Sequence, residues 1–296
     1  MTIHTLTKEM IGLEKISPSA LDCFEGCPRL FYYQNWLGLK LEDDKRHMDF
    51  GTAIHGALET LYSLYDDNFK NRWDGEEFQP VEDKFLSLWR HYHVTEDSFQ
   101  KFLNTKAGRE SGFTNKQQLY EQMKEDGLIM LKSYWKEKEH MLVEYGHDLK
   151  DFEVVMKVEM INPVEPHDKL PIPLSMRLDA ISRDLSLVVD FKTSSGAYNQ
   201  EETRKKIQGQ CYIFARFMTT GVFRGKFDYI VLRKGMKSDD RIQVVQLQYD
   251  EADMVAFYQR VRSILVKIAN REFDRPSMGH PRWCRCWDYE QALSVK

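Results

Sequence analysis

The sequence predicts an α/β protein in which helices flank a central mixed β-sheet. Segments with strand-like apolar patterns gather between residues 152 and 248, and helical patterns precede, separate and follow them. The order is helices, three strands, a helix, two strands and a helix, which favours helices packed on both faces of one sheet. The 296 residues are 42% hydrophobic, which is enough for a sizeable core. We therefore expect one domain spanning residues 1–296.

The N-terminal segment, residues 17–66, is predicted to contain helices. Ser17 and Pro18 have the residue types preferred for the cap and the first position of a helix. A second helix is expected over residues 50–65, where apolar residues recur at helical spacing. This helix carries His55 on a face next to the apolar stripe.

Residues 81–145 form a charge-rich segment with a helical pattern and no strand signal. The strands that complete the sheet come only after it. We therefore interpret residues 81–145 as a helical insertion rather than an independent domain. It is also the place where specificity for a partner or a substrate is most expected.

The strand signals begin at residue 152, and residues 152–248 are predicted to form the sheet core. The run from 185 to 191 is almost continuously apolar, as in a strand that is buried on both faces. A C-terminal helix and a cysteine-containing tail occupy residues 250–296. The expected elements are strands at 152–158, 174–181, 185–191, 227–232 and 242–247, and helices at 200–218 and 254–268.

The charge balance limits the kinds of partner. With 42 basic and 46 acidic residues the formal net charge is −4, which is not the basic excess of a protein that coats DNA. A local basic groove is still compatible with this balance, because phosphate contacts need only local positive charge. The candidates for such a groove are residues 204–206, residues 233–234 and Lys237.

The hydropathy of the sequence indicates where in the cell the protein is expected. No apolar run approaches the roughly 18–20 residues that span a bilayer. Residues 1–17 contain no apolar core of signal-peptide type. We therefore expect a cytoplasmic protein with no membrane partner.

Two carboxylates and an amine mark the strongest candidate for chemistry. Asp190 and Lys192 end the apolar strand and, being two residues apart, project from the same face. Asp179 lies eleven residues upstream. Carboxylates hold hard divalent cations, and such a cation beside a lysine can promote attack on a phosphodiester. The alternative is an ordinary strand-end ion pair, usually worth under about 1 kcal/mol.

Five fragments of the chain follow one another in a fixed order. They are Ser19–Phe31 with its Cys27-Pro28, Gly51–Glu59 around His55, Leu178–Ile181, Val189–Thr193 and Gln208–Tyr212. Together they resemble RecB-type members of the PD-(D/E)xK nuclease superfamily, among them the CRISPR adaptation nucleases and free-standing phage exonucleases. This resemblance implies a restriction-endonuclease-like core.

The resemblance implies a set of metal ligands. His55, Asp179, Asp190 and the backbone carbonyl of Phe191 would hold Mg²⁺ or Mn²⁺. Lys192 would position or polarise the attacking water and offset developing charge. On an amphipathic helix, His55 has a simpler interpretation as a surface or core histidine.

Other residues are expected to support the site or contact DNA. Gln208 and Tyr212, four apart on one helical face, would contact DNA or water at the metal. Lys205 is a candidate DNA contact, and Glu153 on a neighbouring strand is a candidate supporting carboxylate. Core packing is the alternative for Tyr212.

The cysteines leave three interpretations open. The count of five is odd, which argues against a disulfide framework. In the family that the chain resembles, one early and three late cysteines hold a [4Fe–4S] cluster, whereas here the late group is only Cys284-Arg285-Cys286. With Cys23 and Cys27 these thiolates would satisfy a cluster or zinc, and His280 is a further candidate zinc ligand. The third interpretation is reduced thiols in a packed terminus.

The main functional hypothesis is a Mg²⁺- or Mn²⁺-dependent DNA nuclease. We expect an exonuclease acting on DNA ends in recombination, repair or phage replication, with a recombination or replication protein as a candidate partner. One alternative is an endonuclease or nicking subunit of a larger complex. Another is a DNA-end-binding scaffold without catalysis. Nothing in the sequence specifies the oligomeric state.

Overall fold

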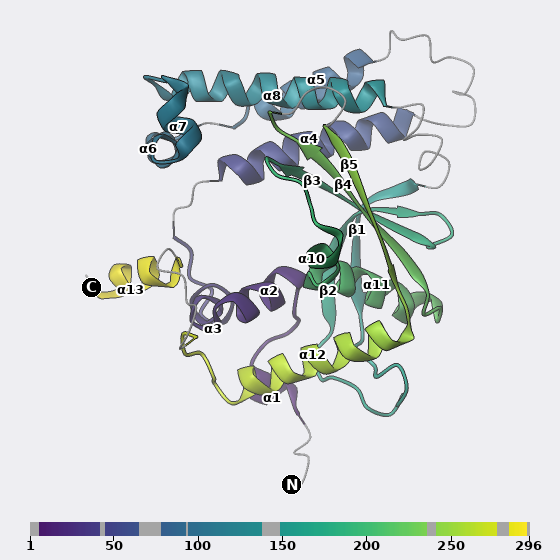
Figure 1. Cartoon of the computed structure of the whole chain (residues 1–296). Coiled ribbons are helices and arrows are strands. Elements are labelled where there is room, and N and C mark those ends of the chain that lie inside the picture. Colours follow the sequence, from purple (N-terminus) through teal and green to yellow (C-terminus); the bar gives the residue numbers. More distant parts are fainter. Residues whose placement is uncertain are drawn as a thin grey trace.

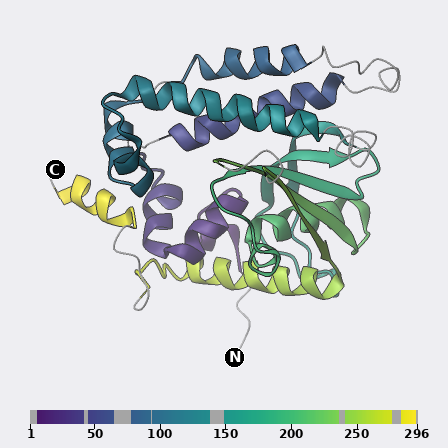
Figure 2. The same ribbon diagram turned by 45° about the horizontal axis from the view of Figure 1, so that its top comes forward.

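A five-stranded mixed β-sheet lies between two helical layers in the computed structural model (Figures 1 and 2). Neighbouring strands pair in the order β1-β2-β3-β4-β5, and only β3 and β4 run parallel. This arrangement confirms the predicted fold class. The strands are β1 (Leu149–Val158), β2 (Leu174–Ser182), β3 (Leu187–Ser194), β4 (Gly225–Arg233) and β5 (Ile242–Tyr249). The structure describes residues 6–41, 45–64, 78–92, 94–137, 149–235, 241–276 and 284–294.

One face of the sheet is covered by helices from both ends of the chain. The helices are α1 (Lys8–Ile11), α2 (Pro18–Gly26), α11 (Ile207–Thr220) and α12 (Glu251–Ala269). Ser17 caps α2 by accepting a hydrogen bond from the Ala20 N–H at 3.2 Å, as its position predicted. Side chains from these helices and from this face of the sheet, including Val188 and Tyr229, form one continuous core.

The opposite face is covered by α4 and the helices that follow it (Figure 1). The helices are α4 (Arg46–Leu64), α5 (Gln79–Trp89), α6 (Glu96–Leu103), α7 (Lys106–Ser111) and α8 (Lys116–Lys136). Helix α4 belongs to the predicted N-terminal helices, whereas α5 to α8 occupy the segment where the helical insertion was expected. Gly127 lies in the middle of α8, where an added Cβ would sit 2.3 Å from the Phe85 ring of α5. The glycine therefore lets the two helices approach closely.

The connection between β3 and β4 differs from the prediction. The expected single helix over 200–218 is wrong, because the chain breaks at Lys205–Lys206 into α10 (Gln200–Arg204) and α11. The break allows α10 to cover the open edge of β5. There the Gln200 amide donates to the Gln246 carbonyl at 2.9 Å, and the Arg204 guanidinium donates to the Gln248 carbonyl.

An early and a late segment of the chain, residues 27–36 and 284–294, lie side by side. Helix α3 (Pro28–Phe31) and the π-helical turn η1 (Tyr32–Trp36) contact α13 (Cys286–Ser294), as Figure 1 shows. The Tyr33 and Tyr289 rings stack with centroids 5.4 Å apart, and Arg29 pairs with Glu290 at 3.2 Å. These contacts bring the early and late cysteines together.

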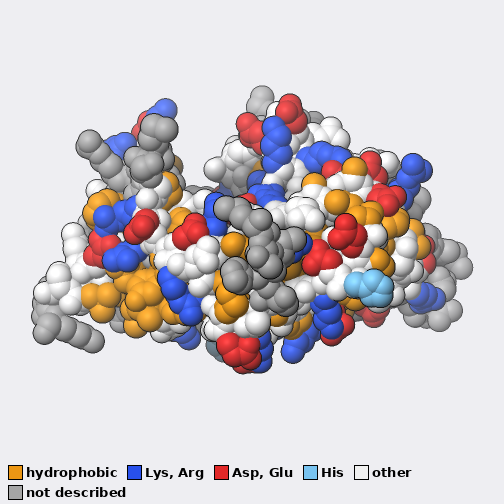
Figure 3. Space-filling model, turned by 90° about the horizontal axis from the view of Figure 1, so that it is seen from below, with side chains coloured by type: hydrophobic (Ala, Val, Ile, Leu, Met, Phe, Trp, Pro, Cys, Tyr) orange, Lys and Arg blue, Asp and Glu red, His pale blue; other side chains and the backbone are white. Residues whose placement is uncertain are grey.

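No helix in the described ranges is both long and apolar enough to cross a membrane. Figure 3 shows the molecule from the side of α12, with basic and acidic side chains interspersed rather than sorted by sign. The described side chains of this face form no continuous basic stripe.

Candidate active site

The two central strands separate where the predicted carboxylates lie. Strands β2 and β3 pair only through Ala180 with Val189 and Ile181 with Val188. The next residues are Asp179 and Asp190. Instead of a ladder bond across the strands, the Phe191 N–H donates to Asp179 Oδ2 at 2.9 Å. The divergence of the strands thus makes room for polar side chains inside a sheet.

Strands β1 and β2 each change the side of the sheet to which their side chains point, and this change orients the carboxylates of the site. Residues two apart on a strand normally point to the same side. On β2, however, Leu178 packs in the core beside α11 and Ala180 in the core beside α4, so the strand switches sides at Asp179. Strand β1 makes the matching switch at Glu153, whose φ of 52° is unusual for a residue other than glycine. Such irregularities are common next to active sites.

Three metal-ligating side chains converge at this point. The three residues are His55 of α4, Glu153 and Asp179. Each offers one ligand atom, and these three atoms lie within 4.8 Å of one another. His55 Nδ1 is 3.5 Å from Asp179 Oδ2, and Arg177 holds Glu153 at 3.2 Å. Two carboxylates and an imidazole suit Mn²⁺, and the carboxylates also suit Mg²⁺. The donor set therefore fits the divalent ion that the sequence implied.

Asp190 lies beside this group but is not part of it. Its side chain is fully buried, and its Oδ1 accepts a hydrogen bond from the Gln208 amide at 3.0 Å. Its Oδ2 forms an ion pair with Lys192 and accepts no hydrogen bond from any other described residue. One buried carboxylate oxygen is thus left with capacity for another partner, such as a cation.

Electrostatics link the two carboxylates. Burial, followed by the negative charge of Asp190, raises the pKa of Asp179 to about 6, against the opposing effects of His55 and Lys192. Burial acts to lower the pKa of Lys192, but the charges of Asp190 and Asp179 outweigh it and the pKa is raised overall. Lys192 is therefore an ammonium that neutralises the acidic pair. A divalent ion at this position would compete with it.

Gln208 and Tyr212 form a relay behind Asp190. Gln208 donates to the Tyr212 hydroxyl at 2.7 Å, and that hydroxyl donates to the Arg177 carbonyl at 3.0 Å. Tyr212 is only 3% exposed, so it orients Gln208 and is not open to solvent. Lys205, the predicted DNA contact, is exposed and pairs with Glu201 at 3.1 Å. Its contact with DNA stays a prediction.

The structure adds Tyr198, which sequence reasoning did not single out, and selects Lys206 from the basic run 204–206. Tyr198 follows β3, and the Lys206 ammonium lies 3.9 Å from the centre of its ring. The basic run 204–206 was noticed in the sequence. Which of its side chains approaches the site depends on the break between α10 and α11, which no local pattern indicated.

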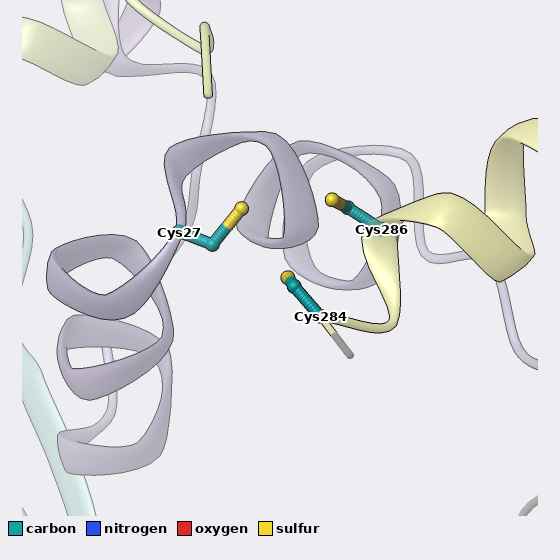
Figure 4. A group of neighbouring side chains, drawn as sticks. All are labelled: Cys27, Cys284 and Cys286. Carbon is teal, nitrogen blue, oxygen red and sulfur yellow. The ribbon is translucent and has the colours of Figure 1, made fainter. Parts of the chain in front are cut away.

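The cysteines of the two ends form a separate group (Figure 4). Cys27, between α2 and α3, lies with Cys284 and Cys286 so that the three sulfurs are within 4.8 Å of one another, and all three residues are buried. Burial raises the pKa of Cys27 to about 12, with Cys284 adding to the effect and the Leu30 N–H opposing it.

The fourth candidate thiol stands apart from that group. Cys23 donates weakly to Gln34 at 3.8 Å, and burial followed by Cys284 raises its pKa to about 11. All five cysteines are free thiols. The sulfurs of Cys27, Cys284 and Cys286 are thus close enough together to bind one metal ion. Cys23 lies near enough for Cys284 to affect its pKa. His280 and Lys237 lie outside the described residues.

Comparison with known proteins agrees with this geometry. A model of the PD-(D/E)XK nuclease superfamily matches residues 15–289. A provisionally named exonuclease from Eubacterium rectale has a similar structure, with 12% identity, a TM-score of 0.50 and coverage of 98% of this chain and 92% of that chain. The chain belongs to the PD-(D/E)XK nuclease superfamily.

Two further solved structures overlap parts of the chain. A phage-related exonuclease from Haemophilus somnus is 14% identical, with a TM-score of 0.30 and coverage of 62% of this chain and 97% of that chain. An alkaline exonuclease from Laribacter hongkongensis is 13% identical, with a TM-score of 0.26 and coverage of 56% and 73%. Scores this low carry no argument about architecture or function.

Proposed function

We propose that this protein is a Mg²⁺- or Mn²⁺-dependent deoxyribonuclease that degrades DNA from its ends. The observation that carries the proposal is the convergence of His55, Glu153 and Asp179 beside the Asp190–Lys192 pair, in a member of a nuclease superfamily. When bound there, the ion would supply Lewis-acid stabilisation of the phosphate and a lowered pKa for the attacking water.

The protein's own residues have separate tasks in this proposal. Asp179, His55 and Glu153 would hold the cation, and Asp190 beside them would be a further carboxylate ligand. The Phe191 carbonyl remains a candidate ligand. The backbone N–H of the same residue fixes the Asp179 carboxylate. Lys192 then stabilises charge that develops on the phosphate.

The relay behind the site is assigned a positioning role. Gln208 fixes the Asp190 carboxylate, and the buried Tyr212 fixes Gln208. Because the site would bind backbone phosphates rather than bases, we expect cleavage with little sequence preference. The biological setting would be recombination, repair or phage replication in the cytoplasm, with a partner protein still to be found.

The choice of an exonuclease is supported by the name of the Eubacterium rectale protein that shares the architecture. The test compares end-labelled linear DNA with covalently closed circular DNA, with Mg²⁺, Mn²⁺ or chelator. An exonuclease degrades the linear DNA only, and only with metal. Cleavage of the circle would favour the endonuclease alternative. DNA binding without any cleavage in Mn²⁺ would favour the scaffold alternative.

We also propose that the cysteine group binds metal. Cys27, Cys284 and Cys286 would provide three thiolates, and Cys23 would provide the fourth for zinc or for a [4Fe–4S] cluster. The raised pKa of Cys27 means that metal binding would have to displace a proton. Its role would be to fasten α13 to α3 rather than to act on DNA.

A further inference from the structure

Lys206 holds an exposed positive charge against an aromatic platform. Its ammonium lies 3.9 Å from the centre of the Tyr198 ring, close enough for a cation–π interaction. Tyr198 is itself fixed, because its N–H donates to the Gln243 side chain at 2.9 Å and its carbonyl accepts from that side chain at 2.8 Å. The lysine therefore rests on a support that is tied to strand β5.

This charge lies next to the proposed catalytic lysine. Lys192 and Lys206 both approach the Tyr229 ring, with their ammonium groups 5.8 Å and 5.9 Å from its centre. The two ammonium groups are thus no further apart than the sum of those distances. Phosphates follow one another about every 3.4 Å of axis along one strand. The two lysines are therefore close enough to each other to contact neighbouring phosphates of the same strand.

The position is unfavourable for a lysine that has only a structural role. Lys206 is the N-cap residue of α11, where polar side chains that accept hydrogen bonds are preferred and the helix dipole repels a cation. Within the described part of the chain, no carboxylate lies at ion-pair distance from it. Partial burial of the ammonium and the charge of Lys192 lower the pKa of Lys206, and outweigh the opposing charges of Asp190, Asp22 and Glu202. Local conflicts of this kind are expected where function requires them.

The geometry points to Lys206, supported by the Tyr198 ring, as the binding site for a DNA backbone phosphate adjacent to the one that is cleaved. This inference deepens the proposed function and rests on it. It assigns the contact to Lys206 rather than to its neighbour Lys205, whose charge is already paired with Glu201. A phosphate at Lys206 would keep the strand in register while Lys192 faces the reacting phosphorus.

The test measures DNA affinity without cleavage, in chelator, at several salt concentrations. Lys206→Ala should weaken binding roughly tenfold and lower the slope of log affinity against log salt by about one, as expected for one lost phosphate contact. Lys206→Arg should restore most of the affinity. Lys205→Ala removes the same charge one residue earlier and should change affinity by less than about twofold.

Two variants of Tyr198 test whether its ring supports Lys206. Tyr198→Phe keeps the ring and should bind DNA like the wild type, whereas Tyr198→Leu should lose several-fold in affinity. Under cleavage conditions, Lys206→Ala should raise KM more than it lowers kcat, because binding is lost and the reacting groups remain.

Two results would overturn the inference. One is an unchanged salt slope in Lys206→Ala, and the other is an equal loss in Lys205→Ala, which would indicate general surface charge. Failure of the proposed function gives a different result, because wild-type protein would then bind DNA and cleave none in Mg²⁺ or Mn²⁺. The binding comparison remains informative in that case.

Discussion

At the scale of single residues, the site separates one buried ion pair from three converging ligands. Residue type and spacing were enough to select Asp179, Asp190 and Lys192 as candidates, and the family resemblance added His55. It could not show that Asp190 pairs with Lys192 while Glu153 joins the other group. That division depends on where two strands diverge, which is a property of the sheet and not of any local pattern.

The raised pKa of Asp179 leads to a prediction about stability. The folded protein holds this pKa at about 6, above the ordinary value of 3.8, so folding favours the neutral form. That contribution is complete below about pH 4 and is lost as the pH rises through 6. In metal-free protein at pH 8, Asp179→Asn should therefore be more stable than wild type, by on the order of 2 kcal/mol.

Thermal unfolding in chelator at pH 8 and at pH 5 checks this prediction. The advantage of Asp179→Asn should shrink at pH 5, where the wild-type carboxyl is largely protonated. Saturating Mn²⁺ should reverse the order, because the wild type gains binding energy that the variant lacks. A variant that melts below wild type at pH 8 in chelator would contradict the assigned pKa.

At the scale of elements, most helices and strands follow from apolar periodicity, and the exceptions are set by tertiary contacts. The break between α10 and α11 has no glycine or proline to announce it. It occurs because α10 lies along the edge of β5 while α11 packs on the face of the sheet. This break also places Lys206 against Tyr198, so the sequence could name the basic run 204–206 but not the lysine that approaches the site.

The packing of α5 against α8 gives a prediction at this scale. Gly127→Ala would place a Cβ 2.3 Å from the Phe85 ring, and the overpacking should destabilise the protein by about 1–3 kcal/mol. Gly51→Ala is the matched control, since Gly51 is also within a helix but its added Cβ would meet no atom within 4 Å. The control should be neutral or stabilising by up to about 1 kcal/mol.

Urea unfolding of the two variants provides the measurement. A midpoint for Gly127→Ala that matches that of Gly51→Ala would show that α5 and α8 are not in close contact. The comparison is direct because both substitutions add one methyl group to a helical glycine.

At the scale of the whole molecule, the sheet is enclosed by helices from distant parts of the chain, and residues 27–36 meet residues 284–294 at the cysteines. The sequence predicted the mixed sheet and its two helical layers from the order of the elements alone. The prediction of one domain over residues 1–296 stays a prediction. The meeting of α3 with α13 could be anticipated only through the family resemblance, because no local pattern reports contacts across the full length of a chain.

The contact between the two cysteine-containing segments gives a prediction about metal content. Protein purified anaerobically should contain roughly one zinc or four iron ions per chain, detected by elemental analysis and, for iron, by visible absorption. Cys284→Ser should lose this metal and make α13 more sensitive to protease. Cys211→Ser removes a buried thiol of α11 instead, and should keep the metal. Metal-free wild-type protein with a protected tail would support reduced, packed thiols.

The claim on which the account depends is that Asp179 and its neighbours hold a divalent cation that Lys192 replaces when the ion is absent. Calorimetric titration of chelator-treated protein with Mn²⁺ tests it most directly. Asp179→Asn should weaken Mn²⁺ binding at least tenfold, and Lys192→Gln should bind Mn²⁺ as tightly as wild type or more tightly, because a competing cation is gone. Wild-type Mn²⁺ affinity in Asp179→Asn would contradict the account.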